Sequence, residues 1–286
     1  MCATCGCSGA AVVRLVTADE PDAAGGHRAA GHPAGAHDDH GTHDHRHQHH
    51  DDLAPDEFLI KAPGDSDRTV QLQQKVLAKN DALAQRNREW LRQRGILAVN
   101  LMSSPGAGKT TLLERTAGDL AERISISVVE GDQETALDAR RIRAAGCEVV
   151  QINTGAGCHL DAQMLADGLA ALDPPTGSII MIENVGNLVC PALFDLGEEA
   201  RVVLASVTEG ADKPVKYPHM FRRADLVLVT KTDLLPYVDF DVRRYAADLR
   251  KVSPGALMIQ LSAVTGQGID AWYQWLRRRT PAPQER

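Results

Sequence analysis

The chain has 286 residues, of which 43% are hydrophobic, and a formal net charge of −7. This size and apolar content suffice for a large buried core, whereas the acidic balance disfavours a surface dedicated to nucleic acid or to anionic lipid. No apolar stretch approaches the roughly 20 residues needed to cross a bilayer, and the start MCATCGCSGA lacks the basic and apolar regions of a signal peptide. We therefore expect a cytoplasmic protein with no nucleic-acid partner and no membrane partner.

The first feature in chain order is the segment CATCGC, which places three thiols close together. In a reducing compartment, clustered cysteines are better interpreted as metal ligands or redox groups than as disulfides. Closely spaced thiolates suit a soft or borderline transition metal. A zinc finger would need a second ligand pair, and a thioredoxin-like centre would need a surrounding βαβ unit, so both alternatives are weaker. Residues 1–9 are predicted to be a CxxCxC metal-binding motif with the ligands Cys2, Cys5 and Cys7.

The next segment, residues 10–65, is rich in Gly, Ala, Asp and His and is predicted to be disordered. Residues 27–52 carry nine of the eleven histidines and leave only His159 and His219 elsewhere, which is typical of a flexible metal-binding tract. Apolar residues then recur at loosely helical spacing from Val70 to Trp90. This spacing predicts an amphipathic helix over residues 66–95.

From residue 96 to residue 282, short aliphatic runs alternate with helical patterns. The runs are ILAVNLM, ISISVVE, CEVVQIN, SIIMIEN, ARVVLASV, DLVLVT and ALMIQLS. Such alternation is typical of an α/β domain whose mostly parallel sheet is covered by helices on both faces. Ligands bind beyond the carboxyl ends of the strands in these sheets, so functional residues are expected directly after each run.

The segment SSPGAGKTT, residues 103–111, follows the first run and precedes a helical pattern. It fits the P-loop pattern from the second glycine onward, with Ser103 in place of the first. Small residues let backbone N–H groups approach phosphate oxygens, Lys109 adds a positive charge, and the Thr110 hydroxyl can bind Mg²⁺. The alternative is an ordinary glycine-rich turn. The residues predicted to hold a nucleotide are Gly106, Gly108, Lys109, Thr110 and Thr111.

A second motif, TKTD at residues 230–233, follows the run DLVLVT and resembles the guanine-specificity motif Asn-Lys-x-Asp of GTPases. Thr230 replaces the asparagine, but the aspartate that reads the guanine edge and the lysine whose stem stacks on the base are retained. LSAVTG, residues 261–266, resembles the Ser-Ala segment that closes over the same base. A surface turn is the alternative for TKTD alone. We predict GTP as the nucleotide, bound by Lys231, Asp233, Ser262 and Ala263.

Two carboxylates complete the predicted nucleotide site. Asp132 in VVEGDQET and Glu183 in IIMIENVGN each follow an aliphatic run, where a carboxylate can bind Mg²⁺ or orient its waters. We predict that Asp132 binds Mg²⁺ together with Thr110, and that Lys109, Asp132 and Glu183 have catalytic roles. The alternatives are helix capping for Asp132 and a salt-bridged strand end for Glu183.

A second candidate metal site lies at the ends of two other runs. Cys158 and His159 follow one run and Cys190 follows another, so all three are expected at the same edge of the sheet. A buried cysteine is common enough that Cys190 alone would mean little. Glu183 precedes Cys190 by seven residues, so we expect a change at the phosphate side to reach the metal side through a short loop.

Together these motifs resemble the HypB family, GTPases that assist nickel insertion into [NiFe] hydrogenase. The resemblance is carried by CATCGC, SSPGAGKTT, VVEGDQET, NTGAGCHLDAQM, IENVGNLVCPA, SVTEGADKPVKYPHMF and TKTD. The urease-maturation family UreG shares the fold and the P-loop, but the Cys-Pro-His motif expected there is not found in this sequence.

The resemblance implies a P-loop NTPase fold of the SIMIBI type and a homodimer that forms on GTP binding. It further implies a tight nickel site at Cys2, Cys5 and Cys7 and a nickel or zinc site at Cys158, His159 and Cys190 near the dimer interface. The implied partners are a HypA-like nickel chaperone, a SlyD-like protein and the hydrogenase large-subunit precursor.

Slow GTP hydrolysis is expected, because a switch needs a long-lived bound state and the sequence shows no obvious arginine finger near the P-loop. Two other functions stay open: a nickel storage or detoxification protein, which the His tract favours, and a urease-maturation GTPase. Storage alone does not explain Lys109, Asp132 and Asp233. Lys213, in TEGADKP, is either a contact across the dimer or an ordinary solvated lysine.

Overall fold

The computed structural model describes residues 12–15, 63–132, 137–155 and 157–280, with side chains described from residue 74 onward in the first helix. The predicted thiol motif at residues 1–9 and the histidine tract at residues 27–52 therefore fall outside the described residues.

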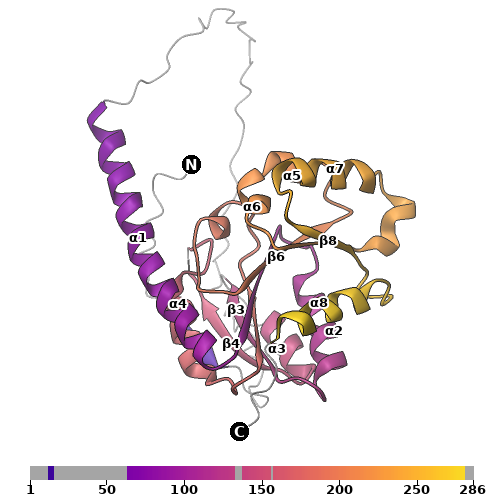
Figure 1. The fold of residues 1–286 in the computed structure, drawn as a ribbon, viewed down its shortest axis with the longest axis horizontal. Coiled ribbons are helices and arrows are strands. Elements are labelled where there is room, and N and C mark those ends of the chain that lie inside the picture. The colour runs from indigo at the N-terminus through magenta and orange to yellow at the C-terminus, as the bar shows by residue number, and fades with distance from the viewer. Residues whose placement is uncertain (1–11, 16–62, 133–136, 156, 281–286) are drawn as a thin grey trace, which may run out of the picture.

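An eight-stranded sheet forms the centre of the described chain (Figure 1), in the order β1-β4-β3-β5-β2-β6-β7-β8. All neighbouring strands are parallel except the pair β1 and β4, which is antiparallel. The parallel strands coincide with the aliphatic runs, which confirms the predicted α/β fold with a mostly parallel sheet. Their bounds are β2 (Leu97–Ser103), β3 (Ile126–Asp132), β4 (Glu148–Asn153), β5 (Ile179–Glu183), β6 (Ala200–Ser206), β7 (Leu226–Thr230) and β8 (Leu257–Gln260).

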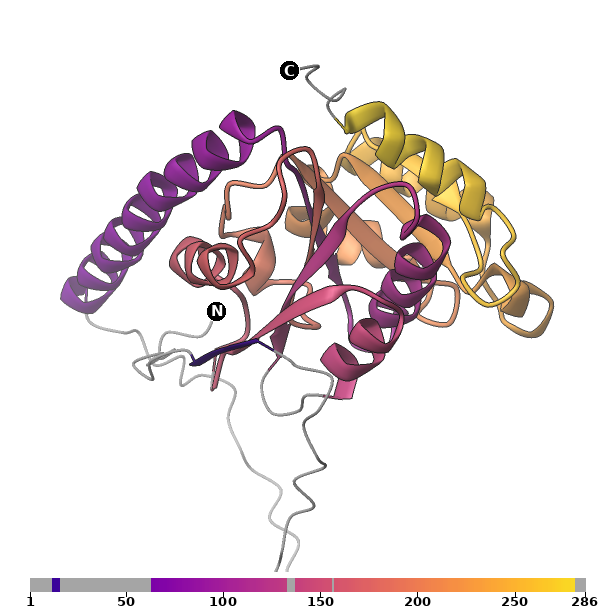
Figure 2. The same ribbon diagram turned by 90° about the horizontal axis from the view of Figure 1, so that it is seen from below.

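Helices cover both faces of the sheet, because successive side chains of a buried strand point to opposite faces. Leu97, Val99 and Leu101 of β2 pack with α2 (Lys109–Leu120), α3 (Leu137–Ala144) and α8 (Ile269–Arg279). Ala98, on the opposite face of β2, packs with α1 (Pro63–Gln93) and α4 (Ala162–Leu172). Figure 2 shows α1 on one side of the sheet and α2 and α8 on the other. The second face also carries α6 (Pro218–Arg222) and α7 (Val242–Val252), next to the short α5 (Lys213–Lys216).

β1 (Val12–Leu15) is an edge strand that the sequence analysis did not anticipate. It pairs antiparallel with β4, with Val12 opposite Asn153 and Leu15 opposite Val150. The strand comes from residues 10–65, so the prediction of disorder is wrong for these four residues. The Gly- and His-rich composition of the whole segment concealed the local run VVRL, and a strand at a sheet edge needs only one partner and little burial.

The strand order brings the predicted functional segments to one edge of the sheet. The carboxyl ends of β3, β5, β2, β6 and β7 lie side by side in that order. These ends are followed by the predicted acidic residues, the P-loop and the TKTD turn. The strand order alone therefore places the segments of the candidate site next to one another.

Candidate nucleotide and metal sites

The P-loop connects β2 to α2 and is shaped by two glycines with positive φ, 74° at Gly106 and 95° at Gly108. Side chains other than glycine rarely adopt this conformation, so these positions require glycine. Lys109 begins α2, and its Nζ donates a hydrogen bond to Ser103 Oγ over 3.0 Å. Ser103, which replaces the first glycine of the motif, thus contacts the P-loop lysine directly. Burial lowers the pKa of Lys109.

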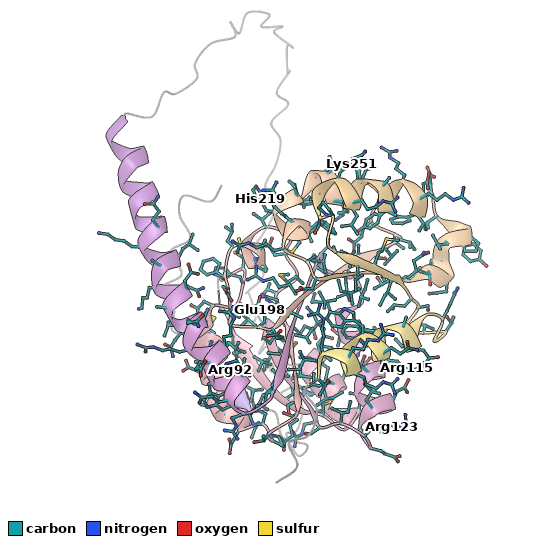
Figure 3. All side chains as sticks on the ribbon, viewed as in Figure 1. Arg92, Arg115, Arg123, Glu198, His219 and Lys251 are labelled. Carbon is teal, nitrogen blue, oxygen red and sulfur yellow. The ribbon has the colours of Figure 1, made fainter. Side chains whose placement is uncertain are left out.

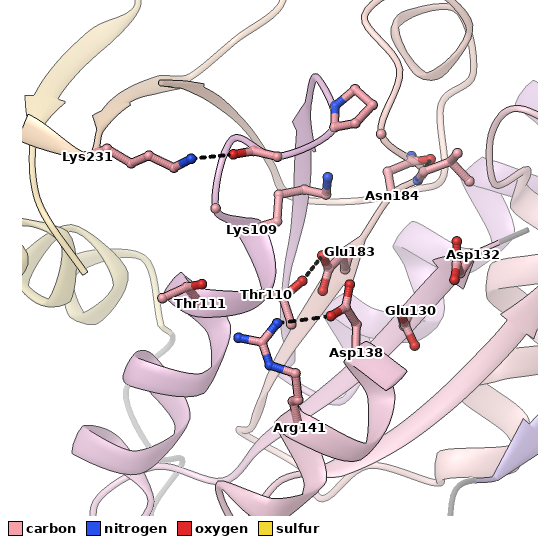
Figure 4. Close-up of a pocket in the computed structure, with 16 residues that line it drawn as sticks. Lys109, Thr110, Thr111, Glu130, Asp132, Asp138, Arg141, Glu183, Asn184 and Lys231 are labelled. Atoms are coloured by element: carbon pink, nitrogen blue, oxygen red, sulfur yellow. Dashed lines mark hydrogen bonds and ion pairs between the residues drawn. The ribbon is translucent and has the colours of Figure 1, made fainter. Parts of the chain in front are cut away.

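The acidic side of the site centres on Glu183, at the end of β5 (Figure 4). Thr110 Oγ1 donates a hydrogen bond to Glu183 Oε1 over 2.9 Å, while Oε2 is buried and has no hydrogen-bond partner in the described chain. Burial raises the pKa of Glu183 to about 7. Asp132, at the end of β3, lines the same cavity. The oxygen atoms of Thr110, Glu183 and Asp132 are of the type that Mg²⁺ prefers.

Glu130 is a cavity residue that the sequence analysis missed. It lies on β3 two residues before Asp132, so both side chains point to the same face of the strand. Its side chain is buried, and burial together with Glu183 and Asp132 raises the pKa of Glu130 to about 9. A glutamate at the end of an otherwise apolar run was the available signal in the sequence.

These groups line a cavity of about 460 Å³. Two of its residues come from α3: Arg141 Nη1 donates to Asp138 Oδ1 over 3.1 Å. Arg141 Nη2 also donates to Glu114 Oε2 over 2.8 Å. An arginine therefore lines the cavity, but two carboxylates hold its guanidinium. The remaining wall includes Gly186, where a Cβ would come within 3.1 Å of Pro105 in the P-loop.

A second cavity of about 290 Å³ adjoins the first, since Gly108, Thr111 and Lys231 line both. Thr230 Oγ1 donates to Ala107 O over 2.7 Å, and Lys231 Nζ donates to Gly106 O over 2.7 Å. The threonine that replaces the family asparagine thus fastens the TKTD turn to the P-loop. The predicted base-reading residues Asp233, Ser262 and Ala263 all line this second cavity.

The predicted domain metal ligands also come together. One ligand atom from each of Cys158, His159 and Cys190 lies within 4.8 Å of the others, although the residues come from two different loops. Cys158 Sγ and His159 Nδ1 are 3.6 Å apart, and the His159 ring stacks on Phe194 with 3.9 Å between centroids. Burial lowers the pKa of His159, which favours the neutral imidazole that binds metals. Two thiols and one imidazole fit nickel or zinc and leave further coordination positions for other ligands.

Lys213 is held within its own chain. Its Nζ donates to Ser104 Oγ over 2.9 Å and lies 3.4 Å from Glu209 Oε2. The ammonium also lies over the Tyr217 ring, 5.3 Å from the centroid. This lysine is therefore a P-loop neighbour rather than an ordinary solvated lysine.

Known proteins match most of this chain. Residues 97–260 match the family described as CobW/HypB/UreG, nucleotide-binding domain. The hydrogenase maturation factor HypB of Rhizobium leguminosarum bv. viciae is 52% identical over 218 residues, which cover 76% of this chain and 73% of that protein.

Two solved structures have the same fold. HypB from Archaeoglobus fulgidus is 42% identical, with a TM-score of 0.68 over 72% of this chain and 100% of the other. HypB from Helicobacter pylori, solved in complex with nickel, is 36% identical, with a TM-score of 0.67 over 73% of this chain and 100% of the other. In addition, no helix within the described ranges combines the length and apolar character needed to cross a membrane.

Proposed function

Because this chain belongs to the HypB family of hydrogenase maturation factors, within the CobW/HypB/UreG nucleotide-binding proteins, we propose that it is a GTPase that binds nickel and assists its insertion into the large subunit of [NiFe] hydrogenase. The observation that carries the proposal is the placement of a thiol–imidazole cluster on loops that adjoin a P-loop cavity. A nickel-bound relative of the same fold supports it.

In the proposed nucleotide site, the P-loop residues Gly106, Gly108, Lys109, Thr110 and Thr111 hold the phosphates. Asp233 and Lys231 of the TKTD turn bind the guanine in the second cavity, and Ser262 and Ala263 close over it. Thr110 and Asp132 would hold Mg²⁺, which supplies positive charge to the phosphates. Glu183 lines the same cavity, its Oε2 has no hydrogen-bond partner among the described residues, and it is proposed to orient the attacking water.

Turnover is proposed to be slow. Arg141 is the cavity arginine, and its guanidinium is held by Asp138 and Glu114 rather than lying free to stabilise charge on a transferring phosphate. An arginine that does reach the phosphates is worth several orders of magnitude in rate. Without an arginine that stabilises charge on the phosphates, GTP hydrolysis is slow, which suits a switch that stays in one nucleotide state for a long time.

Nickel is proposed to be the cargo, and zinc an alternative occupant of the domain site. Cys2, Cys5 and Cys7 form the proposed tight site in the motif at residues 1–9, followed by the His-rich region at residues 10–65. The segment at residues 66–95, most of which lies in α1 (Pro63–Gln93), leads into the proposed GTPase domain at residues 96–282, which carries Cys158, His159 and Cys190. We further propose dimerisation on GTP binding and partners of the HypA-like, SlyD-like and hydrogenase large-subunit precursor types, as the family resemblance implies.

Nucleotide and metal are proposed to be coupled through the backbone between the two sites. Leu160 N, one residue after His159, donates to Asn184 Oδ1 over 3.2 Å. Asn184 directly follows Glu183 and lines the nucleotide cavity. A movement of this strand end on GTP binding would therefore be passed to the loop that holds Cys158 and His159.

A nickel storage protein is the second candidate, and the nine histidines in residues 27–52 favour it. A maturation GTPase and a nickel store differ in whether GTP hydrolysis controls the release of nickel. The deciding experiment supplies nickel-loaded protein to an apo-hydrogenase large subunit with GTP, with a non-hydrolysable analogue and with GDP. A maturation GTPase should activate the enzyme efficiently only with GTP, whereas a store should release nickel equally in all three states.

A further inference from the structure

Two asparagines of α1, Asn80 and Asn87, join the two loops that carry the domain metal ligands. We propose that these side chains are positioning residues, which set the distance between the Cys158–His159 pair and Cys190. The inference rests on the proposed metal site and extends it to a helix that contributes no ligand.

Each asparagine binds both loops. Asn80 Oδ1 accepts a hydrogen bond from Ala162 N over 2.9 Å, and Asn80 Nδ2 donates to Asp195 O over 2.7 Å. Asn87 Nδ2 donates to Ala162 O over 2.8 Å and to Leu196 O over 2.9 Å. Both asparagines are buried, at 5% and 6% exposure. All four bonds end on main-chain atoms, so they fix the path of the two loops rather than one neighbouring side chain.

The bonded positions lie close to the ligands along the chain. Ala162 is three residues after His159 and begins α4. Asp195 follows Phe194, the residue whose ring stacks on the His159 imidazole. A change in the separation of the two loops would therefore alter the stacking of a ligand ring as well as the distance between the ligand atoms.

The face of α1 that makes these bonds also fits closely against the second loop. Asn80, Ala84, Asn87 and Arg88 recur at the spacing of one helix face. A Cβ at Gly197 would collide with the carbonyl of Ala84, so only glycine lets the loop approach the helix this closely.

Charged groups hold the same loop on either side. Arg88 Nη2 binds both carboxylate oxygens of Asp195, at 2.8 and 2.9 Å. Glu198, which is buried and labelled in Figure 3, accepts hydrogen bonds from Leu196 N over 2.8 Å and Arg201 Nε over 2.6 Å. The loop is therefore clamped between α1 and the start of β6, and the asparagines extend this clamp to the first ligand loop.

The test uses the full chain with Cys2, Cys5 and Cys7 changed to serine, so that thiolate signals come from the domain. Asn80→Asp keeps the acceptor for Ala162 N but removes the donor to Asp195 O, and Asn87→Ala removes both donated bonds. Gln74→Ala is the matched control, because Gln74 is an exposed amide on the same helix. Nickel is titrated while the thiolate-to-nickel charge-transfer absorption is recorded, a signal that histidine-bound nickel does not give.

A second readout needs no metal. Diamide oxidises two nearby thiols to a disulfide and is itself reduced, and the rate of Cys158–Cys190 disulfide formation reports the separation of the two loops. We expect both asparagine variants to bind nickel about 10- to 100-fold more weakly, in the range found when groups that orient metal ligands are removed. Disulfide formation should slow several-fold, and the Gln74→Ala variant should match the parent in both assays. Binding of a GTP analogue shows that each variant is folded.

Loss of thermal stability with unchanged nickel affinity and unchanged disulfide rate would show a merely structural role and overturn the proposal. A change in only one of the two readouts would also overturn it, because altered loop spacing must move both. Failure of the proposed metal site is detected separately: either no charge-transfer band would appear on nickel titration, or the band would be unchanged when Cys158 and Cys190 are both changed to serine. In that event the disulfide rate alone decides whether the two amides set the spacing of the loops.

Discussion

The side chain of Leu160 lies directly on Gly131: a Cβ at Gly131 would come within 2.6 Å of Leu160 Cγ. Leu160 is fully buried and directly follows His159, one of the candidate metal ligands. Gly131 directly precedes Asp132 at the end of β3, on the nucleotide side. This contact and the bond from Leu160 N to Asn184 are two independent links between the metal loop and the nucleotide cavity.

Changing Gly131 to alanine should weaken the coupling between nucleotide and nickel. The new methyl group forces Leu160 away, because interiors are close-packed and have no room for the added carbon. In the parent chain we expect nickel affinity at the domain site to differ by about 5- to 150-fold between GDP and a non-hydrolysable GTP analogue, the usual range of coupling between sites. The ratio of nickel affinities in the two nucleotide states should fall towards one in Gly131→Ala. It is measured by charge-transfer titration in chains with Cys2, Cys5 and Cys7 changed to serine.

Gly118→Ala is the control for this experiment. Gly118 lies in α2, and a Cβ there would meet no atom within 4 Å. This exposed substitution should leave the coupling unchanged and raise the free energy of unfolding by roughly 0.5–1 kcal/mol, since alanine is the better helix former. Equal nickel affinity and equal dimer mass in both nucleotide states of the parent chain would show that there is no coupling to weaken.

Lys109→Ala should abolish most GTP hydrolysis while the domain stays folded. The lysine is buried and its pKa is lowered by burial, so its ammonium is costly to the folded chain. Removing it should therefore cost little or no stability, whereas turnover should fall by at least about 100-fold, as for loss of a group that stabilises transition-state charge. Phosphate release and the urea midpoint are the two measurements, with the exposed Lys75→Ala as control. Turnover near the parent rate in Lys109→Ala would remove this residue from the site.

The positions of the parallel strands could be predicted from the sequence because each buried strand is a continuous aliphatic run, and both P-loop and TKTD are local patterns. Cys158, His159 and Cys190 could be grouped for the same reason, since each follows such a run. Glu130 and Arg141 could not be assigned in this way. Their roles depend on which side chains face the cavity from β3 and α3, and that orientation follows from the packing of the strand and helix rather than from a motif.

The burial and the hydrogen bonds of the two α1 asparagines could not be predicted from the sequence for a different reason. Asn80 lies 82 residues before its hydrogen-bond partner Ala162 and 115 residues before Asp195. Polar residues on a mostly polar helix give no sign of burial, so only the tertiary structure reveals that these amides are enclosed. β1 was missed for the opposite reason, because a short apolar run lay within a segment whose overall composition predicts disorder.

Asp233→Asn should shift nucleotide preference from GTP to xanthosine triphosphate. The carboxylate at position 233 is proposed to accept hydrogen bonds from guanine N–H groups, whereas an amide can donate to the additional oxygen of xanthine. Loss of hydrogen bonds to a charged group costs roughly 3 kcal/mol, so GTP affinity should fall by about two orders of magnitude. Competition binding of the two nucleotides measures the shift, with the exposed Asp239→Asn as control. Unaltered preference for GTP would mean that Asp233 does not read the base.

Deleting residues 27–50 should lower the number of nickel ions bound and leave the tightest ion in place. Imidazoles on a long tract offer many weak sites, whereas closely spaced thiolates bind a borderline metal more tightly. Both groups lie outside the described residues, so this expectation depends on ligand chemistry alone. Equilibrium dialysis against a chelator measures stoichiometry and the tightest affinity, and replacement of Cys2, Cys5 and Cys7 by alanine is the complementary variant. If the tightest ion disappeared with the tract and survived the cysteine replacements, the ranking of the sites would be reversed.

The three cysteines of the domain should differ in their reaction with iodoacetamide. Cys147 is buried, and burial raises its pKa to about 11, so near pH 8 almost none of it is the reactive thiolate. Cys158 and Cys190 are only partly buried and belong to the candidate metal site.

We therefore expect Cys158 and Cys190 to be alkylated first, Cys147 to react only as the chain opens, and added nickel to protect the first two. Peptide mass spectrometry over a time course measures each position separately, and the urea-unfolded chain, in which all thiols react, is the reference. Nickel protection of Cys158 without protection of Cys190 would exclude a shared ion. Rapid labelling of Cys147 in the folded chain would show that the strand it precedes opens more readily than its burial implies.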